Sequence, residues 1–234
     1  IKQLEEERLK EKLRANEAQL QYYQLQTDPH FYLNCLNTIS TLLQNEKKEV
    51  ANDMIIALSG HFRYMFRKSR SLVLLKEELE EVQDYCRIYN IRNGIPLLVD
   101  MDVSKSEMLC KVPILCIQTF VENAIKYYGK NGQMLQVRIQ IRRIKKEDKK
   151  EFLKIRITDN GVGYTKENLD EFNKPVDKFV YKSSHVGIDN LKYRFKLIFE
   201  NEADIYFYNA PYSGAVVEMT IPVKEDDSDE NINN

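Results

Sequence analysis

The sequence has few residues that break helices, with eight glycines and six prolines among 234 residues. It also lacks an excess of either charge, because 35 lysines and arginines stand against 36 aspartates and glutamates. A balanced chain has no overall field that would attract nucleic acid or anionic lipid. With 43% hydrophobic and 30% charged residues, the composition predicts a globular protein with a real core and a helical bias.

Cysteine is scarce and follows no ligand or disulfide pattern. Cys35, Cys86, Cys110 and Cys116 lie among apolar residues, with no CxxC pair and no histidine at metal-ligand spacing. We therefore expect buried, reduced thiols, which suit a cytosolic compartment.

Long apolar runs are missing as well. No stretch approaches the roughly 20 apolar residues that cross a bilayer, and no signal peptide is visible. The sequence begins at Ile1 and not at a methionine. We expect a portion of a longer protein, whose missing N-terminal part holds membrane spans and a sensor.

The first 26 residues are charged, contain no glycine or proline, and carry a heptad pattern. Steps of four and three join Leu9, Leu13, Asn16, Leu20 and Tyr23. The pattern predicts a parallel coiled coil in which a core asparagine, Asn16, fixes the register. Because the repeat is short, a solvated amphipathic helix without a partner stays open as the alternative.

Helical spacing continues through the next part of the chain. Apolar residues recur on one face in 33–43 and in 50–62, and the polar run 45–48 separates them. This predicts a helical hairpin. A short connector is expected at 72–75, followed by a third helix that ends near Asn93 and Gly94.

After Gly94 the period of the apolar residues changes to two, which predicts a second, mixed α/β domain. Residues 164–186 have no clear period, and the acidic end from Glu225 is expected to be disordered. Strands are predicted at 97–103, 135–144, 152–158, 205–208 and 216–223, and helices at 113–128 and 186–199.

The first distinctive motif surrounds His30, in the run Leu25–Asn34. A neutral imidazole is a good nucleophile near pH 7. Pro29 removes a backbone donor and is expected to bend the helix, which presents His30 on the outer face. Asp28 could orient the ring. A histidine on a helix is more often structural when no motif surrounds it, and this is our interpretation of His61.

The second motif is Gln118–Lys126, with the core Val-Glu-Asn-Ala-Ile-Lys. On a helix, Glu122, Asn123 and Lys126 lie near one another. The amide oxygen of Asn123 suits Mg²⁺, which needs few protein ligands when phosphates supply the others. Lys126 could meet phosphate oxygens, and Glu122 could orient the metal shell. The alternative is a packed helix that merely ends in polar residues.

The third motif, Asp159–Gly163, reads Asp-Asn-Gly-Val-Gly and follows a predicted strand. A carboxylate at a strand end can accept a hydrogen bond from the exocyclic amine of adenine, which would select ATP over GTP. Gly161 and Gly163 would let the backbone approach the ligand closely. The same residues are also a good turn sequence.

The fourth motif, Ser183–Phe195, contains Gly187 and Asn190. Backbone amides at a helix start that is opened by glycine form an anion site suited to phosphate. The P-loop pattern GxxxxGK and protein-kinase loops are absent from the sequence, which argues against the commoner ATP-binding folds.

In their order and spacing, the four motifs resemble those of LytS/YesM-like sensor histidine kinases, the subfamily with a Pro-His-Phe phosphoacceptor motif and a GHKL-type ATP-binding domain. The resemblance covers most of residues 20–224 and includes Asn34 in the acceptor motif. Three positions depart from the family pattern: Asp28 stands where Asn is usual, His185 replaces the first glycine of the second Gly box, and Ala215 replaces the usual Thr.

The resemblance implies an α+β fold and a homodimer, with a four-helix bundle of dimerisation helices and an α/β-sandwich ATP-binding domain on each side. It implies that His30 is phosphorylated from ATP with Mg²⁺, and that an aspartate of a response regulator receives the phosphoryl group. The coiled-coil helix, the dimerisation and phosphotransfer helices, the catalytic domain and the acidic tail are assigned to residues 1–24, 25–93, 94–224 and 225–234.

Two alternatives remain open from the sequence. The chain could be a degenerate module that binds nucleotide or a partner and transfers no phosphate, for which His185 is the chief support. It could also be an ATPase clamp with the same ATP fold, although that function gives His30 no role.

Overall fold

The computed structural model describes most of the chain between residues 29 and 224. The described ranges are 29–65, 71–94, 96–128, 134–146, 149–175, 186–199 and 202–224. The predicted coiled coil of residues 1–24, the predicted bend that precedes His30, the residues Asp28 and His185, and the acidic tail lie outside them. Within the described residues, no helix is both long and apolar enough to cross a membrane.

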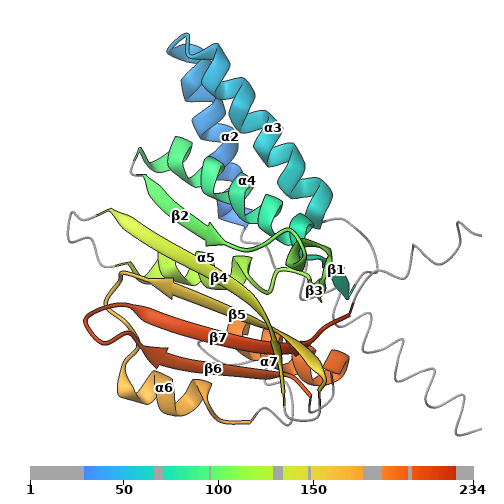
Figure 1. The fold of residues 1–234 in the computed structure, drawn as a ribbon. Helices are drawn as coiled ribbons and strands as arrows, with labels where there is room; N and C mark the ends of the chain where they lie inside the picture. Colours follow the sequence, from blue (N-terminus) through green and yellow to red (C-terminus); the bar gives the residue numbers. More distant parts are fainter. Residues whose placement is uncertain are drawn as a thin grey trace, which may run out of the picture. The chain divides into compact units, whose positions relative to one another are not determined.

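The chain divides into two compact units, Ile1–Arg70 and Ser71–Asn234. In the first, helices α2 (Pro29–Gln44) and α3 (Lys48–Met65) form a hairpin (Figure 1). The backbone N–H of Lys47 donates to the carbonyl of Leu42 at 2.9 Å and closes the turn between them. The predicted helical hairpin is confirmed, with its turn inside the predicted polar run.

The second unit is built on a sheet of five strands, in the order β2-β4-β5-β7-β6. Strand β2 pairs with β4 in parallel, and the other neighbours are antiparallel. Each predicted strand lies within two residues of an observed one. The five strands are β2 (Leu97–Asp102), β4 (Leu135–Lys145), β5 (Glu151–Asp159), β6 (Asp204–Asn209) and β7 (Ala215–Pro222).

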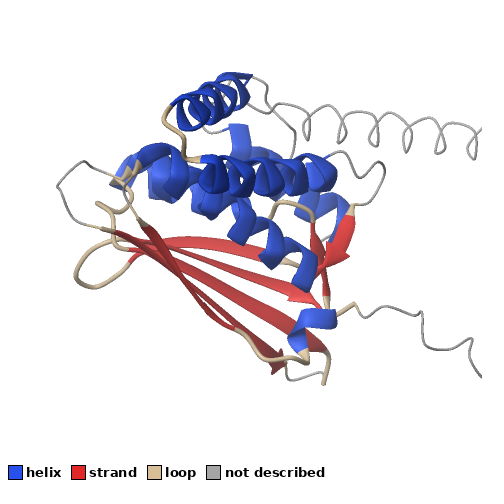
Figure 2. Ribbon diagram, turned by 90° about the horizontal axis from the view of Figure 1, so that it is seen from above, coloured by secondary structure: helices blue, strands red, loops and turns tan. Residues whose placement is uncertain are grey.

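Helices cover one face of this sheet, and no helix of the described residues lies across the other face (Figure 2). Buried and more exposed residues alternate along β4, as expected for a strand with one covered face. The buried residues are Leu135, Val137, Ile139 and Ile141. The helices of this layer are α4 (Leu75–Asn93), α5 (Gln118–Tyr127) and α7 (Val186–Phe199). The mixed α+β fold that was predicted, a helical region followed by an α/β layer, is confirmed.

Several short elements differ from the sequence prediction. The predicted connector at 72–75 contains strand β1 (Leu72–Leu74), which pairs antiparallel with β3 (Lys111–Pro113). The 3₁₀ turn η1 (Glu107–Leu109) precedes β3. As a result, the helix expected from residue 113 begins only at Gln118.

Helix α4 packs against β1, β2 and α5, and therefore lies in the second unit. The sequence-based division placed it with the phosphotransfer helices, before a boundary at residues 93 and 94. In the structure, the compact second unit begins at Ser71. The assignment of residues 25–93 to one functional domain stays a prediction.

Candidate functional site

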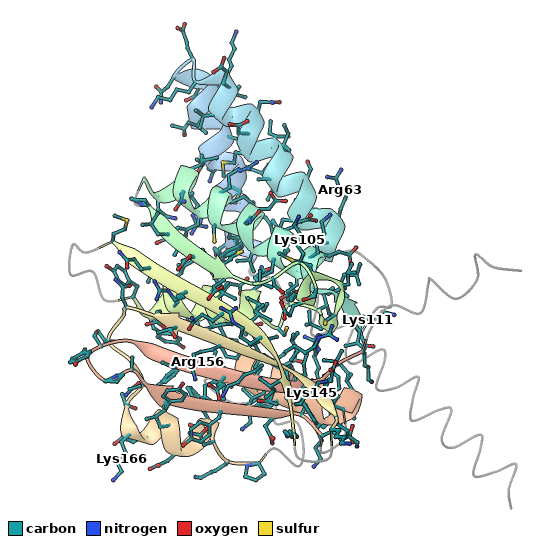
Figure 3. The ribbon with its side chains drawn as sticks, viewed as in Figure 1. Arg63, Lys105, Lys111, Lys145, Arg156 and Lys166 are labelled. Carbon is teal, nitrogen blue, oxygen red and sulfur yellow. The ribbon has the colours of Figure 1, made fainter. Side chains whose placement is uncertain are left out.

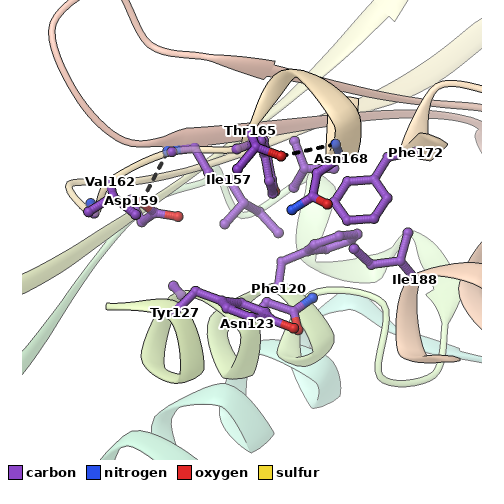
Figure 4. A pocket seen from close by; sticks show the side chains of 16 residues that line it. Phe120, Asn123, Tyr127, Ile157, Asp159, Val162, Thr165, Asn168, Phe172 and Ile188 are labelled. Atoms are coloured by element: carbon purple, nitrogen blue, oxygen red, sulfur yellow. Dashed lines mark hydrogen bonds between the residues drawn. The ribbon is translucent and has the colours of Figure 1, made fainter. Parts of the chain in front are cut away.

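A cavity of about 200 Å³ lies in the second unit, between the helical layer and the end of the central strands (Figure 4). Its walls come from α5, from the loop after β5, from the start of α7, and from α6 (Lys166–Phe172), a helix that the sequence did not predict. Most of the lining is apolar, and includes Phe120, Ile157, Phe172, Ile188 and Val217. Such a cavity suits a flat, largely apolar ring with a few polar groups.

Asp159 supplies a carboxylate to this cavity from the last position of β5. Its Oδ1 accepts hydrogen bonds from the backbone N–H groups of Gly161, at 2.8 Å, and Ala215, at 3.1 Å. Within the described residues, Oδ2 has no such donor. Burial raises the pKa of Asp159, and the two backbone hydrogen bonds oppose the rise. Oδ2 of Asp159 can therefore accept a hydrogen bond from a donor group on a bound ring.

The two glycines of the loop after β5 also line the cavity, and the structure shows what each position requires. A Cβ on Gly161 would lie 3.0 Å from Oδ1 of Asp159. Gly163 has φ +79°, and a Cβ there would lie 2.7 Å from Oδ1 of Asn209. Since an L side chain rarely adopts this φ and would also clash, Gly163 cannot be replaced without displacing the loop.

Helix α5 turns Asn123 toward the cavity, together with Phe120 and Tyr127 (Figure 4). The other two residues predicted from this motif lie elsewhere on the helix. Glu122 is exposed and accepts a hydrogen bond from Nε2 of Gln118 at 2.7 Å. Lys126 is exposed, with Nζ 5.3 Å from the centre of the Tyr127 ring. Only Asn123 of the three lines the cavity itself.

The start of α7 reaches the cavity through Ile188. Its neighbour Gly187 is exposed and lies against α5, since a Cβ there would be 3.6 Å from Cγ2 of Thr119. Asn190 is half-buried one turn further on, and its Oδ1 has no hydrogen-bond partner within the described chain. Gly187 and Asn190 therefore lie near the cavity without lining it.

His30 lies in the hairpin, at the second residue of α2, and its side chain is exposed. Asn34 is exposed one turn further along the same helix. His61 differs, since it is buried and its Nε2 lies 3.3 Å from the hydroxyl of Tyr32. The exposure of His30 leaves it accessible to a reactant, whereas His61 has the structural environment that its sequence context predicted.

Buried charges that the sequence did not identify position α5. Glu78 of α4 is fully buried and accepts hydrogen bonds from the backbone N–H groups of Leu115, Ile117 and Gln118, at 2.7, 2.9 and 3.3 Å. On the other side, Arg194 of α7 donates to the carbonyl of Ile114. A glutamate in a helical pattern normally indicates a solvated position, so no sequence signal pointed to Glu78.

The described residues contain no cluster of three or more His, Cys, Asp or Glu side chains that could hold a metal ion. A Mg²⁺ ion that travels with phosphates needs only one or two protein oxygens. The side-chain amide of Asn123, at the cavity wall, can supply one. A single amide oxygen of this kind suits a metal ion whose other ligands come from phosphate groups.

Two family models match the chain. Residues 18–97 match the histidine kinase family, and residues 113–225 match the histidine kinase-, DNA gyrase B- and HSP90-like ATPase family. Among solved structures, the catalytic domain of histidine kinase ThkA aligns with 64% of this chain and 93% of its own length, at 18% identity and a TM-score of 0.44.

Curated relatives are similar in sequence to nearly the whole chain. An uncharacterized sensor-like histidine kinase of Staphylococcus epidermidis is 29% identical over 90% of the chain and 40% of the relative. Sensor protein LytS of Staphylococcus saprophyticus is 31% identical over 88% of the chain and 34% of the relative. The chain thus spans less than half the length of these relatives. From both family models and these relatives, the chain belongs to the sensor histidine kinases of two-component systems.

Proposed function

We propose that this chain binds ATP in the cavity of its second unit and transfers the γ-phosphoryl group to His30. The observation that carries the proposal is Asp159, a half-buried carboxylate at the cavity wall whose Oδ2 accepts no hydrogen bond from the described residues. That oxygen would accept a hydrogen bond from the exocyclic amine of adenine, and the apolar walls would contact the ring. Guanine has a carbonyl at the corresponding position and would be rejected.

The phosphate groups would extend from the cavity past Asn123 toward the exposed side of α5, where Lys126 can meet phosphate oxygens as a point charge. The amide oxygen of Asn123 would hold Mg²⁺, which neutralises phosphate charge when bound. Gly187 and the amides at the start of α7 would provide a further anion site. Glu122 is exposed on the same helix, and we retain it as an orienting group.

Transfer would follow the ordinary balance of a phosphoryl-transfer reaction. A lone pair on the His30 imidazole attacks the γ-phosphorus, the bond to the bridging oxygen breaks, and ADP leaves. Asn34, exposed one turn away, and Asp28 would orient the acceptor ring. The phosphohistidine would then pass its phosphoryl group to an aspartate of a response regulator.

The working protein would be a homodimer, in which the α2–α3 hairpins of two chains pair as a four-helix bundle. Several large apolar side chains that α2 and α3 expose in the single chain would be covered there.

We propose further that the chain is the cytoplasmic portion of a bacterial inner-membrane sensor, and that nucleic acid is not among its partners.

The test is autophosphorylation with γ-labelled ATP and Mg²⁺. Wild-type chain should gain acid-labile label, His30→Gln should gain none, and Asp159→Asn should need far more ATP. Asp170→Asn is the matched control, because Asp170 is an exposed carboxylate on α6 that does not line the cavity. Wild-type protein that binds ATP without becoming labelled would instead support the degenerate binding module. Steady ATP turnover without labelling would support the ATPase clamp.

A further inference from the structure

The segment after the glycine loop is tied to the edge strand β6 at both ends. At its start, Oδ1 of Asn209 accepts the backbone N–H of Tyr164 at 2.7 Å, and Nδ2 of Asn209 donates to the carbonyl of Tyr164 at 2.9 Å. At its end, Oδ1 of Asn173 accepts the N–H of Phe207, and Nδ2 donates to the carbonyl of Phe207, both at 2.9 Å. We call each of these two-bond contacts an amide bracket.

An amide bracket imitates the pairing that a neighbouring strand would provide. A side-chain amide carries a donor and an acceptor side by side, whereas an ionised carboxylate can accept but cannot donate. Strand β6 is at the edge of the sheet, so the outward backbone groups of Phe207 would otherwise be available to another chain. Asn173 occupies both groups, and it fixes the end of α6 at the same time.

The segment between the two brackets forms one wall of the cavity. Thr165 caps α6 by accepting the N–H of Asn168 at 3.2 Å, and both residues line the cavity with Phe172 (Figure 4). The rings of Tyr164 and Phe207 pack against Phe172, with centroids 5.5 and 5.2 Å away. The brackets therefore hold a wall in which aromatic rings lie beside the polar side chains of Thr165 and Asn168.

The bracket at Tyr164 also determines the position of the glycine loop. The Oδ1 atom of Asn209 lies where a Cβ of Gly163 would come within 2.7 Å. The same side chain that binds Tyr164 therefore packs against Gly163. Asn209 thereby connects the position of the edge strand to the loop that also contains Asp159.

We propose that Asn173 and Asn209 are positioning residues, which hold 164–173 as a preformed wall of the nucleotide cavity. The inference rests on the proposed function, since it concerns how the same cavity binds ATP. A wall that is ordered before binding removes an entropic cost that the nucleotide would otherwise meet. Loss of either bracket should therefore weaken ATP binding about 10-fold, without changing the chemistry at His30.

The experiment uses the whole chain and four proteins: wild type, Asn209→Ala, Asn173→Ala and Asn90→Ala. The last is a matched control, because Asn90 brackets Leu97 on the opposite edge strand, at 2.7 and 3.3 Å, and neither residue lines the cavity. For each protein we would measure the Kd for a non-hydrolysable ATP analogue with Mg²⁺, the thermal midpoint, and the KM and kcat of autophosphorylation.

We expect Kd and KM to rise about 10-fold in the Asn173 and Asn209 variants, with kcat at saturating ATP within about twofold of wild type. Asn90→Ala should lower the thermal midpoint similarly and leave Kd unchanged. If wild type binds the analogue and both variants bind it equally well, the positioning role is wrong and the proposed function stands. An equal loss of affinity in Asn90→Ala would also overturn it, since general loosening would then explain the effect. A wild-type chain that binds no nucleotide would overturn both proposals.

Discussion

The helical hairpin and the sheet unit bury their apolar side chains to different extents. In the sheet unit, Ile139, Leu153 and Ile155 have no exposed surface. In the hairpin, large apolar side chains stay between 38% and 58% exposed in the single chain, and these are Leu33, Leu36, Leu43, Val50, Ile55 and Ile56. An apolar face of this kind indicates an interface. The sheet unit thus buries these side chains completely within one chain, whereas the apolar side chains of the hairpin would be covered in the proposed dimer.

The two units also differ in how they present the candidate nucleotide site and His30. The candidate nucleotide site is a cavity with mostly apolar walls in the sheet unit. His30 lies exposed on the unit that leaves apolar surface uncovered. In our proposal the imidazole must meet a nucleotide and later a separate regulator, so an exposed position suits it.

The largest effect is expected from opening the core of the sheet unit. Ile155→Ala removes a fully buried side chain and should lower the free energy of unfolding by about 2–5 kcal/mol, from lost transfer energy and the cavity left behind. Leu98→Ala is the control, because Leu98 is 49% exposed on β2 and should cost less than about 1 kcal/mol. Urea unfolding measures both. Equal costs would contradict the description of this unit as a self-contained core.

The next effect tests the incomplete core of the hairpin. Leu36 is 57% exposed on α2, and Leu36→Glu should raise the dissociation constant of the proposed dimer about 100-fold. Each of two chains would lose about 1.5 kcal/mol of apolar burial. Analytical ultracentrifugation over a concentration series measures the change.

The control for that measurement is Asn37→Glu, which adds the same charge at an exposed neighbouring position. A Leu36→Glu chain that associates as strongly as wild type would show that another surface joins the chains.

The third prediction concerns a buried charge, which distinguishes the sheet unit from a purely apolar core. Glu78→Gln should lower the free energy of unfolding by about 2 kcal/mol, because an amide cannot accept all three backbone donors and places its own N–H groups among them. Thermal and urea unfolding measure the loss. Glu80→Gln on the same helix is the control, since Glu80 is exposed and forms a surface ion pair with Lys76. If Glu78→Gln left the free energy of unfolding unchanged, α5 would not depend on this carboxylate.

The sequence predicted the long, periodic elements well, and it missed those that depend on distant contacts. The alternation in β4 and the helical spacing of α3 are repeated over several residues, so single exceptions do not hide them. Strands β1 and β3 have three residues each, which is too short for a period. Helix α6 has seven residues, and two amide brackets from outside its own sequence hold it in place.

The candidate site divides in the same way. Asp159, Gly161 and Gly163 were found because a strand end followed by a glycine loop is a local pattern, and all three line the cavity. Asn209 was missed because its importance depends on β6 lying beside the glycine loop, about 45 residues away in sequence. Local reading identifies groups that could touch a ligand, whereas the groups that position them require the tertiary structure.

The smallest effect is expected on the open face of the sheet. There Glu218 of β7 accepts two hydrogen bonds from Arg156, at 2.8 and 3.0 Å, and pairs with Lys154 at 2.7 Å (Figure 3, where Arg156 is labelled). Burial alone would raise the pKa of Glu218, but the hydrogen bonds from Lys154 and Arg156 outweigh it and lower the pKa. Because the folded state holds this proton less tightly than the unfolded state, the ion pairs stabilise the fold above the ordinary glutamate value of about 4.5.

Glu218→Gln should therefore cost about 0.5–1 kcal/mol at pH 7, the range of partly exposed ion pairs. The difference from wild type should shrink as the pH falls below about 4.5, where the unfolded state takes up the proton first, and it should vanish once the pH is below the lowered pKa of the folded state. Urea unfolding from pH 3 to pH 7 measures the difference, with Glu80→Gln as the exposed control. A cost that stayed constant over this range would mean that Glu218 stabilises the sheet by its shape and not by its charge. Since β5 and β7 also carry the fully buried Ile155 and Met219 on the opposite face, the comparison with Ile155→Ala measures how far the stability of one sheet depends on its covered side.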